Sequence, residues 1–187
     1  NMPRNKTYDN VAQAIGDTPM IRINRLIPPG QATVFAKLEF FQPLNSVKDR
    51  IGAAMIEAGE RDGKIKEGTI IIEPTSGNTG IAFASIGRAL GHSVTIFMPA
   101  WMSAERINLL RSLGAGIVLV SREEGGFLGS IARAEELARA TPGAFLPRQF
   151  SNRDNCEAHY QTTGPEILGQ LAAEGLVPAA FVAGVGT

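Results

Sequence analysis

This chain has one cysteine, no net charge and no long apolar run, and each of these features argues against a class of protein. Cys156 is the single cysteine among 187 residues, so no disulfide can form within the chain and a reducing, cytoplasmic location is expected. Lys plus Arg and Asp plus Glu number 18 each, so the zero net charge gives no reason to expect nucleic acid or an anionic membrane as partner. No run has the length of a signal peptide or membrane span, and no His, Cys and carboxylate cluster has metal-site spacing.

Short apolar runs alternate with longer helical patterns along most of the chain. Strands are predicted at residues 19–24, 33–39, 69–74, 93–99, 116–121, 144–150 and 179–186. Helices are predicted at residues 49–63, 79–91, 103–114, 129–140 and 156–175, with Ser103 as an N-cap and glycines closing several of them. The runs "TIIIE" and "GIVLV" do not alternate, so both faces of these strands should be buried. The pattern predicts an α/β protein whose parallel sheet carries helices on both faces.

Ligands of open parallel sheets lie beyond the carboxyl ends of the strands, and three polar or glycine-rich turns should meet there. They are residues 43–50 ("PLNSVKDR"), 74–80 ("PTSGNTG") and 183–187 ("AGVGT"). The last turn could offer backbone N–H groups and a hydroxyl to a phosphate, although a glycine turn after a strand is common.

The segment "PTSGNTG" is denser in polar and glycine residues than a helix cap requires. It is neither a P-loop nor a dinucleotide fingerprint, because Gly-Lys-Ser/Thr and G-x-G-x-x-G are both missing. Its N–H groups and hydroxyls at a helix N-terminus favour a carboxylate-binding loop. The alternative is a set of Asx and Ser/Thr turns that cap the helix and bind nothing.

Lys48 is the reactive side chain of the first turn. A helix N-terminus repels a lysine and lowers its pKa, which would suit an amine nucleophile or base. Spacing alone nevertheless favours an ordinary solvated lysine paired with Asp49 or a glutamate. Of the other chemically reactive residues, His92 is expected to be a solvated turn residue, His159 a structural hydrogen-bonding group and Cys156 a packed, inert thiol.

Six motifs in this order resemble the cysteine synthase (O-acetylserine sulfhydrylase) family, the β-family of pyridoxal-phosphate enzymes that includes cystathionine β-synthase. They are "NSVKDR", "EPTSGNTG", "MPAWMSAERINLLRSLGA", "QFSN", "TTGPEI" and "AGVGT". The resemblance runs from "IGDTPMIRINRL" to residue 187. Two positions depart from the family pattern: Asn45, where glycine is frequent, and Arg153, where proline is usual.

The resemblance implies a role for each matching residue. Lys48 would form the Schiff base with pyridoxal phosphate, and Asn78 would hydrogen-bond the ring hydroxyl of this cofactor. The substrate carboxylate would be bound by Thr75, Ser76, Gly77, Thr79 and Gln149. The cofactor phosphate would be bound by Gly184, Gly186 and Thr187, which match the start of the family's phosphate loop.

The resemblance also implies a fold and a reaction. The fold would be two open, mostly parallel twisted sheets with helices on both faces (pyridoxal-phosphate fold type II, similar to tryptophan synthase β). Residues 45–152 would form the smaller domain, and residues 1–44 and 153–187 would be parts of a larger domain whose remainder is absent from this chain.

The reaction would be β-replacement on O-acetylserine by sulfide, through an aminoacrylate intermediate, to give L-cysteine. A homodimer and docking of serine acetyltransferase are also implied. The alternatives are a cystathionine β-synthase, a serine/threonine dehydratase-type lyase, or a non-catalytic fragment that binds serine acetyltransferase.

Overall fold

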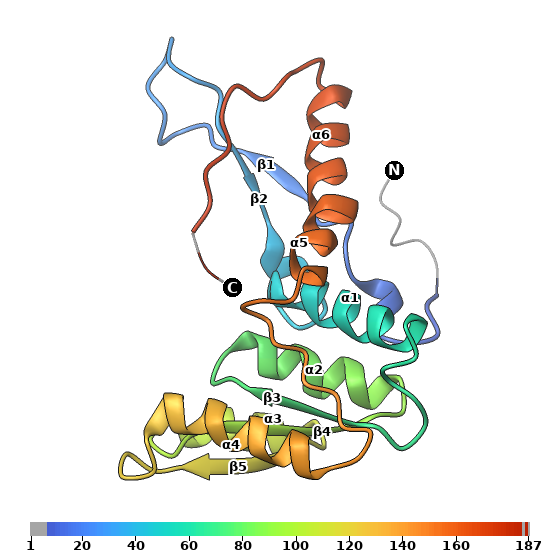
Figure 1. Ribbon diagram of the computed structural model, residues 1–187. Helices are drawn as coiled ribbons and strands as arrows, with labels where there is room; N and C mark the ends of the chain where they lie inside the picture. Colours follow the sequence, from blue (N-terminus) through green and yellow to red (C-terminus); the bar gives the residue numbers. More distant parts are fainter. Residues whose placement is uncertain (1–6, 185, 187) are drawn as a thin grey trace.

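A three-stranded parallel sheet forms the lower half of the molecule in Figure 1. The computed structural model describes residues 7–184 and residue 186. The strands are β3 (Ile70–Pro74), β4 (Ser93–Pro99) and β5 (Gly116–Val120), in the order β3-β4-β5. Ile72 pairs with Thr95 of β4, and Phe97 of β4 pairs with Val118 of β5. The predicted α/β architecture is therefore confirmed.

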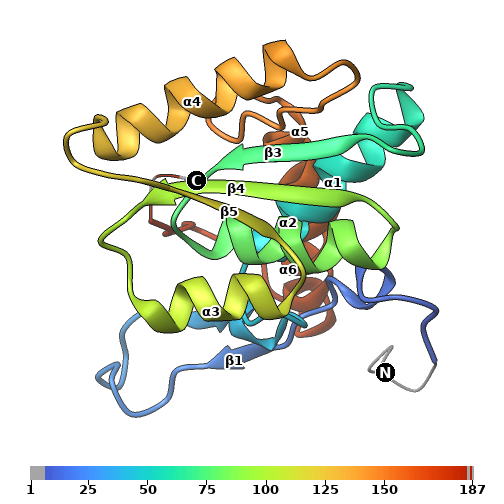
Figure 2. The same cartoon turned by 90° about the horizontal axis from the view of Figure 1, so that it is seen from below.

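Helices cover both faces of this sheet, as the sequence predicts (Figure 2). Helix α4 (Gly126–Ala140) lies on one face, while α2 (Asn78–Ala89) and α3 (Ala104–Ser112) lie on the other. Helix α1 (Lys48–Arg61) packs on α2 rather than on the strands. Helices α2 and α3 connect successive parallel strands, which need such crossovers and cannot be joined by a hairpin turn.

The apolar side chains of the strands divide between two cores. Ile71, Ile96 and Met98 point to the side of α1 and α2 and belong to the larger cluster with Phe83. Ile72 and its neighbours in the next strands form a smaller cluster under α4. Because successive strand residues face opposite sides, both faces of β3 and β4 are apolar, which explains why these runs do not alternate.

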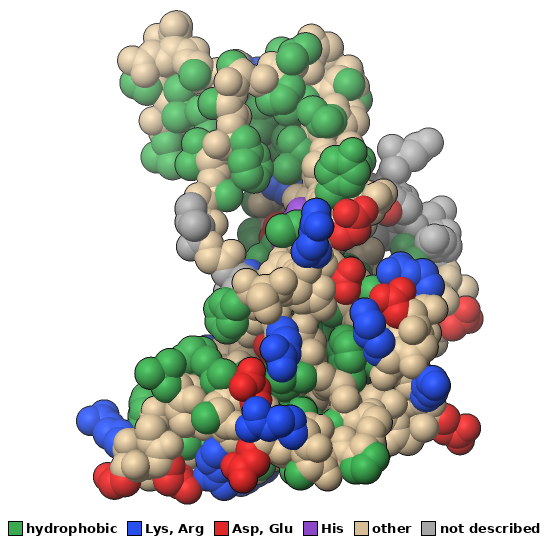
Figure 3. All heavy atoms as spheres, in the orientation of Figure 1, with side chains coloured by type: hydrophobic (Ala, Val, Ile, Leu, Met, Phe, Trp, Pro, Cys, Tyr) green, Lys and Arg blue, Asp and Glu red, His purple; other side chains and the backbone are tan. Residues whose placement is uncertain are grey.

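The upper half contains a short antiparallel pair and a helical segment. Strands β1 (Met20–Arg22) and β2 (Phe35–Lys37) pair with each other, and 3-10 helices span Ala12–Ala14 and Glu39–Phe41. Helices α5 (Asp154–Ala158) and α6 (Gly164–Ala173) flank a π-helical turn at His159–Thr163. Apolar side chains gather on the upper surface in Figure 3, and the most exposed large ones include Leu26, Val177 and Val182.

Three strand predictions differ from the structure. Strand β5 is an edge strand, so Leu119 is 37% exposed and the prediction that both its faces are buried is wrong. Residues 144–150 contribute only one bridge, Ile71 to Phe145, because Pro147 has no N–H group and Arg148 has a positive φ of 57°. Residues 179–184 form no strand and are exposed, since no described segment pairs with their backbone.

The predicted helices are all present, with shifted ends. Ser103 caps α3 by accepting from the N–H of Arg106, as predicted. Lys48 lies in the first turn of α1 rather than in the preceding turn. His92 is not solvated, because its Nε2 lies 2.7 Å from Glu60 and its side chain is only 8% exposed. Cys156 is exposed rather than packed, on the short helix α5.

Two further features concern the described residues only. None of their helices combines the length and apolar character needed to cross a bilayer. Nor does any group of three or more His, Cys, Asp and Glu side chains among residues 7–184 and 186 converge as metal ligands would.

Candidate active site at the carboxyl ends of the strands

One cavity of about 340 Å³ lies where the turn before α1 meets the loop after β3. Seven residues singled out from the sequence line it together: Lys48, Thr75, Ser76, Gly77, Asn78, Thr79 and Gln149. They come from three separate segments, so only the fold brings them together. The volume is within the range of small-molecule sites, and the position beyond the strand ends is the one expected for an α/β sheet.

Among the described residues that line the cavity, Lys48 is the only one with a charged side chain. It is half-buried, and this burial lowers the pKa of its ammonium group below the ordinary value. Among the described residues its Nζ has no hydrogen-bond or ion-pair partner, so the solvated pair with Asp49 is not formed. The turn before it reverses at Asn45, whose φ is +61°. Asparagine tolerates this left-handed region, where glycine is the usual residue.

Asp49 holds that turn from within the protein. The N–H of Leu44 donates to its Oδ2 at 2.7 Å, and the side chain is completely buried. Burial raises the pKa of the Asp49 carboxyl to about 6, and the nearby charge of Glu39 adds to this effect. Lys48 is therefore the first residue of a helix whose preceding turn is fixed by its neighbour Asp49.

Backbone hydrogen bonds hold both ends of the loop that follows β3. The N–H of Thr75 donates to the carbonyl of Phe97 in β4 at 3.0 Å, which continues the sheet by one residue. At the other end, the N–H of Gly80 donates to the carbonyl of Gly77 at 3.1 Å and opens α2. Gly80 has no room for a side chain, because an added Cβ would lie 2.9 Å from Thr75. The loop thus exposes Ser76, Gly77 and Asn78 between two fixed points.

A buried chain of polar groups supports the floor of the cavity. The Thr79 hydroxyl donates to Oε1 of Gln149 at 2.8 Å, and both side chains are buried. Gln149 in turn hydrogen-bonds the carboxylate of Glu73, which is 1% exposed. Burial raises the pKa of Glu73 to about 7 despite that bond and backbone bonds from residues 148 and 149. The Oε2 atom of Glu73 has no hydrogen-bond partner among residues 7–184 and 186.

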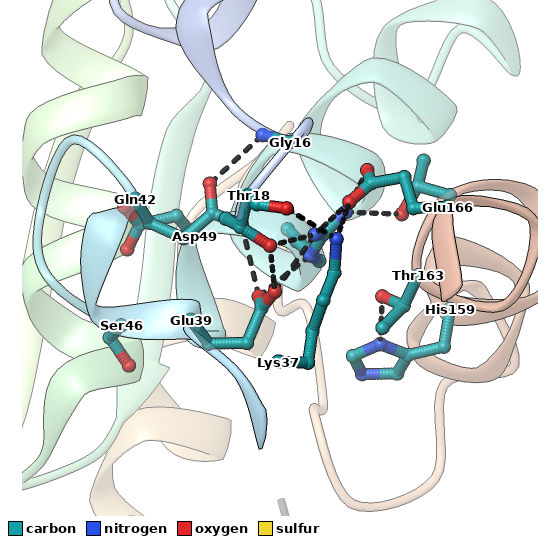
Figure 4. Close-up of polar contacts among 12 residues, drawn as sticks. Gly16, Thr18, Lys37, Glu39, Gln42, Ser46, Asp49, His159, Thr163 and Glu166 are labelled. Atoms are coloured by element: carbon teal, nitrogen blue, oxygen red, sulfur yellow. Dashed lines mark hydrogen bonds and ion pairs between the residues drawn. The ribbon is translucent and has the colours of Figure 1, made fainter. Parts of the chain in front are cut away.

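Near the start of α1, a charge network ties this helix to the upper half (Figure 4). Arg50 is 3% exposed and bonds both carboxylate oxygens of Glu39 and both of Glu166, at distances of 2.7 to 2.9 Å. Lys37 bonds Glu166 at 2.6 Å. The two cations and two carboxylates balance, as buried charges require. The start of α1 is therefore anchored two residues after Lys48.

Not every predicted site residue is in the cavity wall. Gly184 and Gly186 are exposed and do not line it, and Thr187 lies outside the described residues. The cavity also includes four residues that the sequence analysis did not select: Ser46, Val47, Phe127 and Phe150. Three of these are close chain neighbours of selected residues. Phe127 follows β5 at the start of α4, so the rule about strand ends could have found it.

Comparison with known proteins connects this geometry with a family. The family model described as pyridoxal-phosphate dependent enzyme matches residues 11–187. A probable cysteine synthase of Bacillus subtilis (strain 168) is 48% identical over 182 residues, which are 97% of this chain and 58% of that protein.

Solved structures agree with the sequence match. A cysteine synthase of Entamoeba histolytica is 37% identical with a TM-score of 0.85, over 93% of this chain and 52% of that one. A hydrogen sulfide-producing enzyme of Fusobacterium nucleatum is 44% identical with a TM-score of 0.82, over 88% and 49%. The chain thus spans a little over half the length of the curated relatives that it matches. With the family model covering nearly all of its length, the chain belongs to the family of pyridoxal-phosphate dependent enzymes.

Proposed function

We propose that the protein carrying this chain is a pyridoxal-phosphate-dependent cysteine synthase, which forms L-cysteine from O-acetylserine and sulfide. The observation that carries the proposal is the half-buried, unpaired Lys48 facing the 75–79 loop across one cavity. The residues fit the cofactor, because a lysine with a lowered pKa can react as a free amine and the cavity can hold a small molecule. The names of the similar proteins point to the same sulfur chemistry.

Lys48 has two tasks in this proposal. Its amine would hold the cofactor, and it would move the proton at Cα of the substrate as general base. Its reduced exposure matters for both tasks, because burial disfavours the ammonium form and leaves more free amine at neutral pH. Bound pyridoxal phosphate supplies the electron sink that stabilises negative charge at Cα.

The 75–79 loop and Gln149 orient the substrate. A carboxylate accepts hydrogen bonds only, and this loop offers backbone N–H groups, the hydroxyls of Thr75 and Ser76, and the start of α2, while the Thr79 hydroxyl holds Gln149. Asn78 is exposed at the first position of α2 and is proposed to bond the ring hydroxyl of the cofactor. Gly184, Gly186 and Thr187 are proposed to begin the phosphate loop.

The wider proposals concern the whole protein. We assign residues 45–152 to a smaller domain and residues 1–44 and 153–187 to a larger one. We also propose a cytoplasmic homodimer that takes serine acetyltransferase as a partner, and the likeness to cysteine synthases supports this proposal. The proposed acceptor is tested by comparing turnover with sulfide and with homocysteine. Efficient formation of cystathionine from homocysteine would favour the cystathionine β-synthase alternative.

The decisive experiment replaces Lys48 in the protein that carries this chain. Borohydride reduction followed by peptide mass analysis should find cofactor on the peptide with Lys48 in the wild type and no adduct in Lys48→Ala. Turnover of O-acetylserine with sulfide should fall by roughly a hundredfold or more, since one residue holds the cofactor and moves the proton.

Lys64→Ala is the matched control, because Lys64 is exposed and its one ion pair within the described part of the chain is with Asp62. This variant should keep both adduct and turnover. A reducible adduct that persists in Lys48→Ala would assign the attachment to another lysine and refute the proposal.

A further inference from the structure

The carbonyl of Ser76, in the middle of the cavity loop, is held by a side chain from another helix. Nη1 of Arg106 in α3 donates to this oxygen at 2.7 Å, and the Arg106 side chain is half-buried. The bonds of Thr75 and Gly80 described above fix the two ends of the loop, but not this carbonyl. The orientation of the peptide unit between Ser76 and Gly77 therefore depends on Arg106.

That orientation decides which polar group faces the cavity. In a planar trans peptide the C=O and the following N–H point in opposite directions. With its carbonyl turned to α3, the unit directs the N–H of Gly77 to the other side, where Thr75 Oγ1 accepts it at 3.3 Å. This is long for an N–H···O bond, so a stronger acceptor such as a carboxylate can replace the hydroxyl.

Glycine at position 77 makes the unit able to turn over. The residue now has φ −118° and ψ −159°, and nothing lies within 4 Å of the place where a Cβ would be. A flip of the 76–77 peptide rotates φ of Gly77 by about 180° into the positive region, which glycine alone enters at little cost. The flipped unit would point the Ser76 carbonyl at the bound anion and repel it.

Helix stability does not account for Arg106. It lies in the first turn of α3, where the helix dipole disfavours a positive charge. It also forms no ion pair with any described residue. Its one side-chain hydrogen bond in the described part of the chain goes to the loop. The position is therefore explained by the loop and not by the helix.

We infer that Arg106 is a positioning residue for anion binding. It locks the Ser76–Gly77 peptide with the N–H of Gly77 turned toward the cavity, ready for the α-carboxylate of an amino-acid substrate. The choice of ligand rests on the proposed function, whereas the locking of the peptide does not.

The test compares Arg106→Met with Arg111→Met in the whole protein. Arg111 is exposed in the last turn of the same helix and has no side-chain partner among the described residues. Hydrogen-exchange mass spectrometry should show exchange in the peptide covering residues 74–80 that is on the order of tenfold faster in Arg106→Met only. Calorimetric titration should show affinity for L-alanine lowered about tenfold, with L-alaninamide, which lacks the carboxylate, much less affected.

A second variant tests the flip itself. In a Gly77→Ala background the positive φ is costly, so Arg106→Met should accelerate exchange by less than it does with glycine present. Unchanged exchange in Arg106→Met, or equal losses for L-alanine and L-alaninamide, would overturn the inference. If neither probe binds the wild-type protein, the proposed function fails, and the exchange comparison alone decides whether Arg106 locks the peptide.

Discussion

Glu73 shows how a single buried side chain links the cavity to pH. It is the second-to-last residue of β3, and it holds the amide of Gln149, which Thr79 holds from the other side. Its burial raises the pKa of the carboxyl from 4.5 to about 7. Between about pH 4.5 and pH 7, the Glu73 carboxyl is therefore mostly protonated in the folded protein and mostly ionised in the unfolded chain.

This shift predicts a pH-dependent loss of stability that Glu73→Gln removes. A raised carboxyl pKa contributes stability at low pH, and this contribution is lost as the pH rises from about 4.5 to about 7. The free energy of unfolding of Glu73→Gln minus that of the wild type should be larger at pH 8 than at pH 5, by up to about 3 kcal/mol. Urea unfolding of both proteins at the two pH values measures the difference, and a difference independent of pH would contradict the assigned cause.

The sequence predicted the cavity residues that lie in contiguous motifs and missed those that act through tertiary contacts. Lys48 and the loop at 75–79 stand out because reactive and polar residues are concentrated next to strand and helix boundaries. Glu73 and Arg106 carry no such signal. Their roles depend on a buried neighbour 76 positions away, Gln149, and on a carbonyl in another segment, Ser76. Spacing along the chain cannot reveal either contact.

At the scale of elements, the close approach of α1 and α2 fixes the distance between Lys48 and the loop. Both helices begin at the cavity, and Gly52 of α1 lies against Ala82 of α2. A Cβ on Gly52 would be 2.9 Å from the Cβ of Ala82 and 3.3 Å from Ile86. Only a residue without a side chain allows this packing, so the glycine is required by the contact and not by its backbone angles.

Gly52→Ala should therefore destabilise the fold although alanine is the better helix former. Overpacking costs roughly 1–3 kcal/mol, against a gain of up to about 1 kcal/mol from helix propensity. Gly169→Ala in α6 is the matched control, since nothing lies within 4 Å of its added Cβ, and it should stabilise the protein. Thermal unfolding measures both, and equal gains from the two substitutions would show that α1 and α2 can separate at no cost.

The elements themselves were predictable to different degrees. Helices were found because period and caps are local, as Ser103 illustrates. Strands were harder to predict from the sequence, since an apolar run becomes a strand only when another strand supplies hydrogen bonds. The runs at 69–74 and 93–99 find such partners, whereas residues 179–184 of the last predicted strand find none within the described part of the chain. Local patterns contain no information on that pairing.

At the scale of the molecule, the Arg50 network joins all three parts of the proposed domain division. Glu39 comes from residues 1–44, Arg50 from the smaller domain, and Glu166 from residues 153–187. Although burial alone raises the pKa of the Glu166 carboxyl, hydrogen bonds from Arg50 and Lys37 lower it from 4.5 to about 2. The network thus contributes to the stability of the whole assembly through charge.

The sign of this shift predicts acid sensitivity. A lowered carboxyl pKa contributes stability above about pH 4.5 that is lost as the pH falls toward 2. Glu166→Gln should therefore be less stable than the wild type at pH 7 by about 3 kcal/mol, because Arg50 remains buried with one carboxylate fewer. The difference in free energy of unfolding between the two proteins should decrease steadily as the pH is lowered. Glu174→Gln replaces an exposed carboxylate just after α6, outside the Arg50 network, and is the matched control. If the free energies of unfolding of the wild type and Glu166→Gln changed in parallel between pH 5 and 3, the network would hold the two halves together through packing and not through charge.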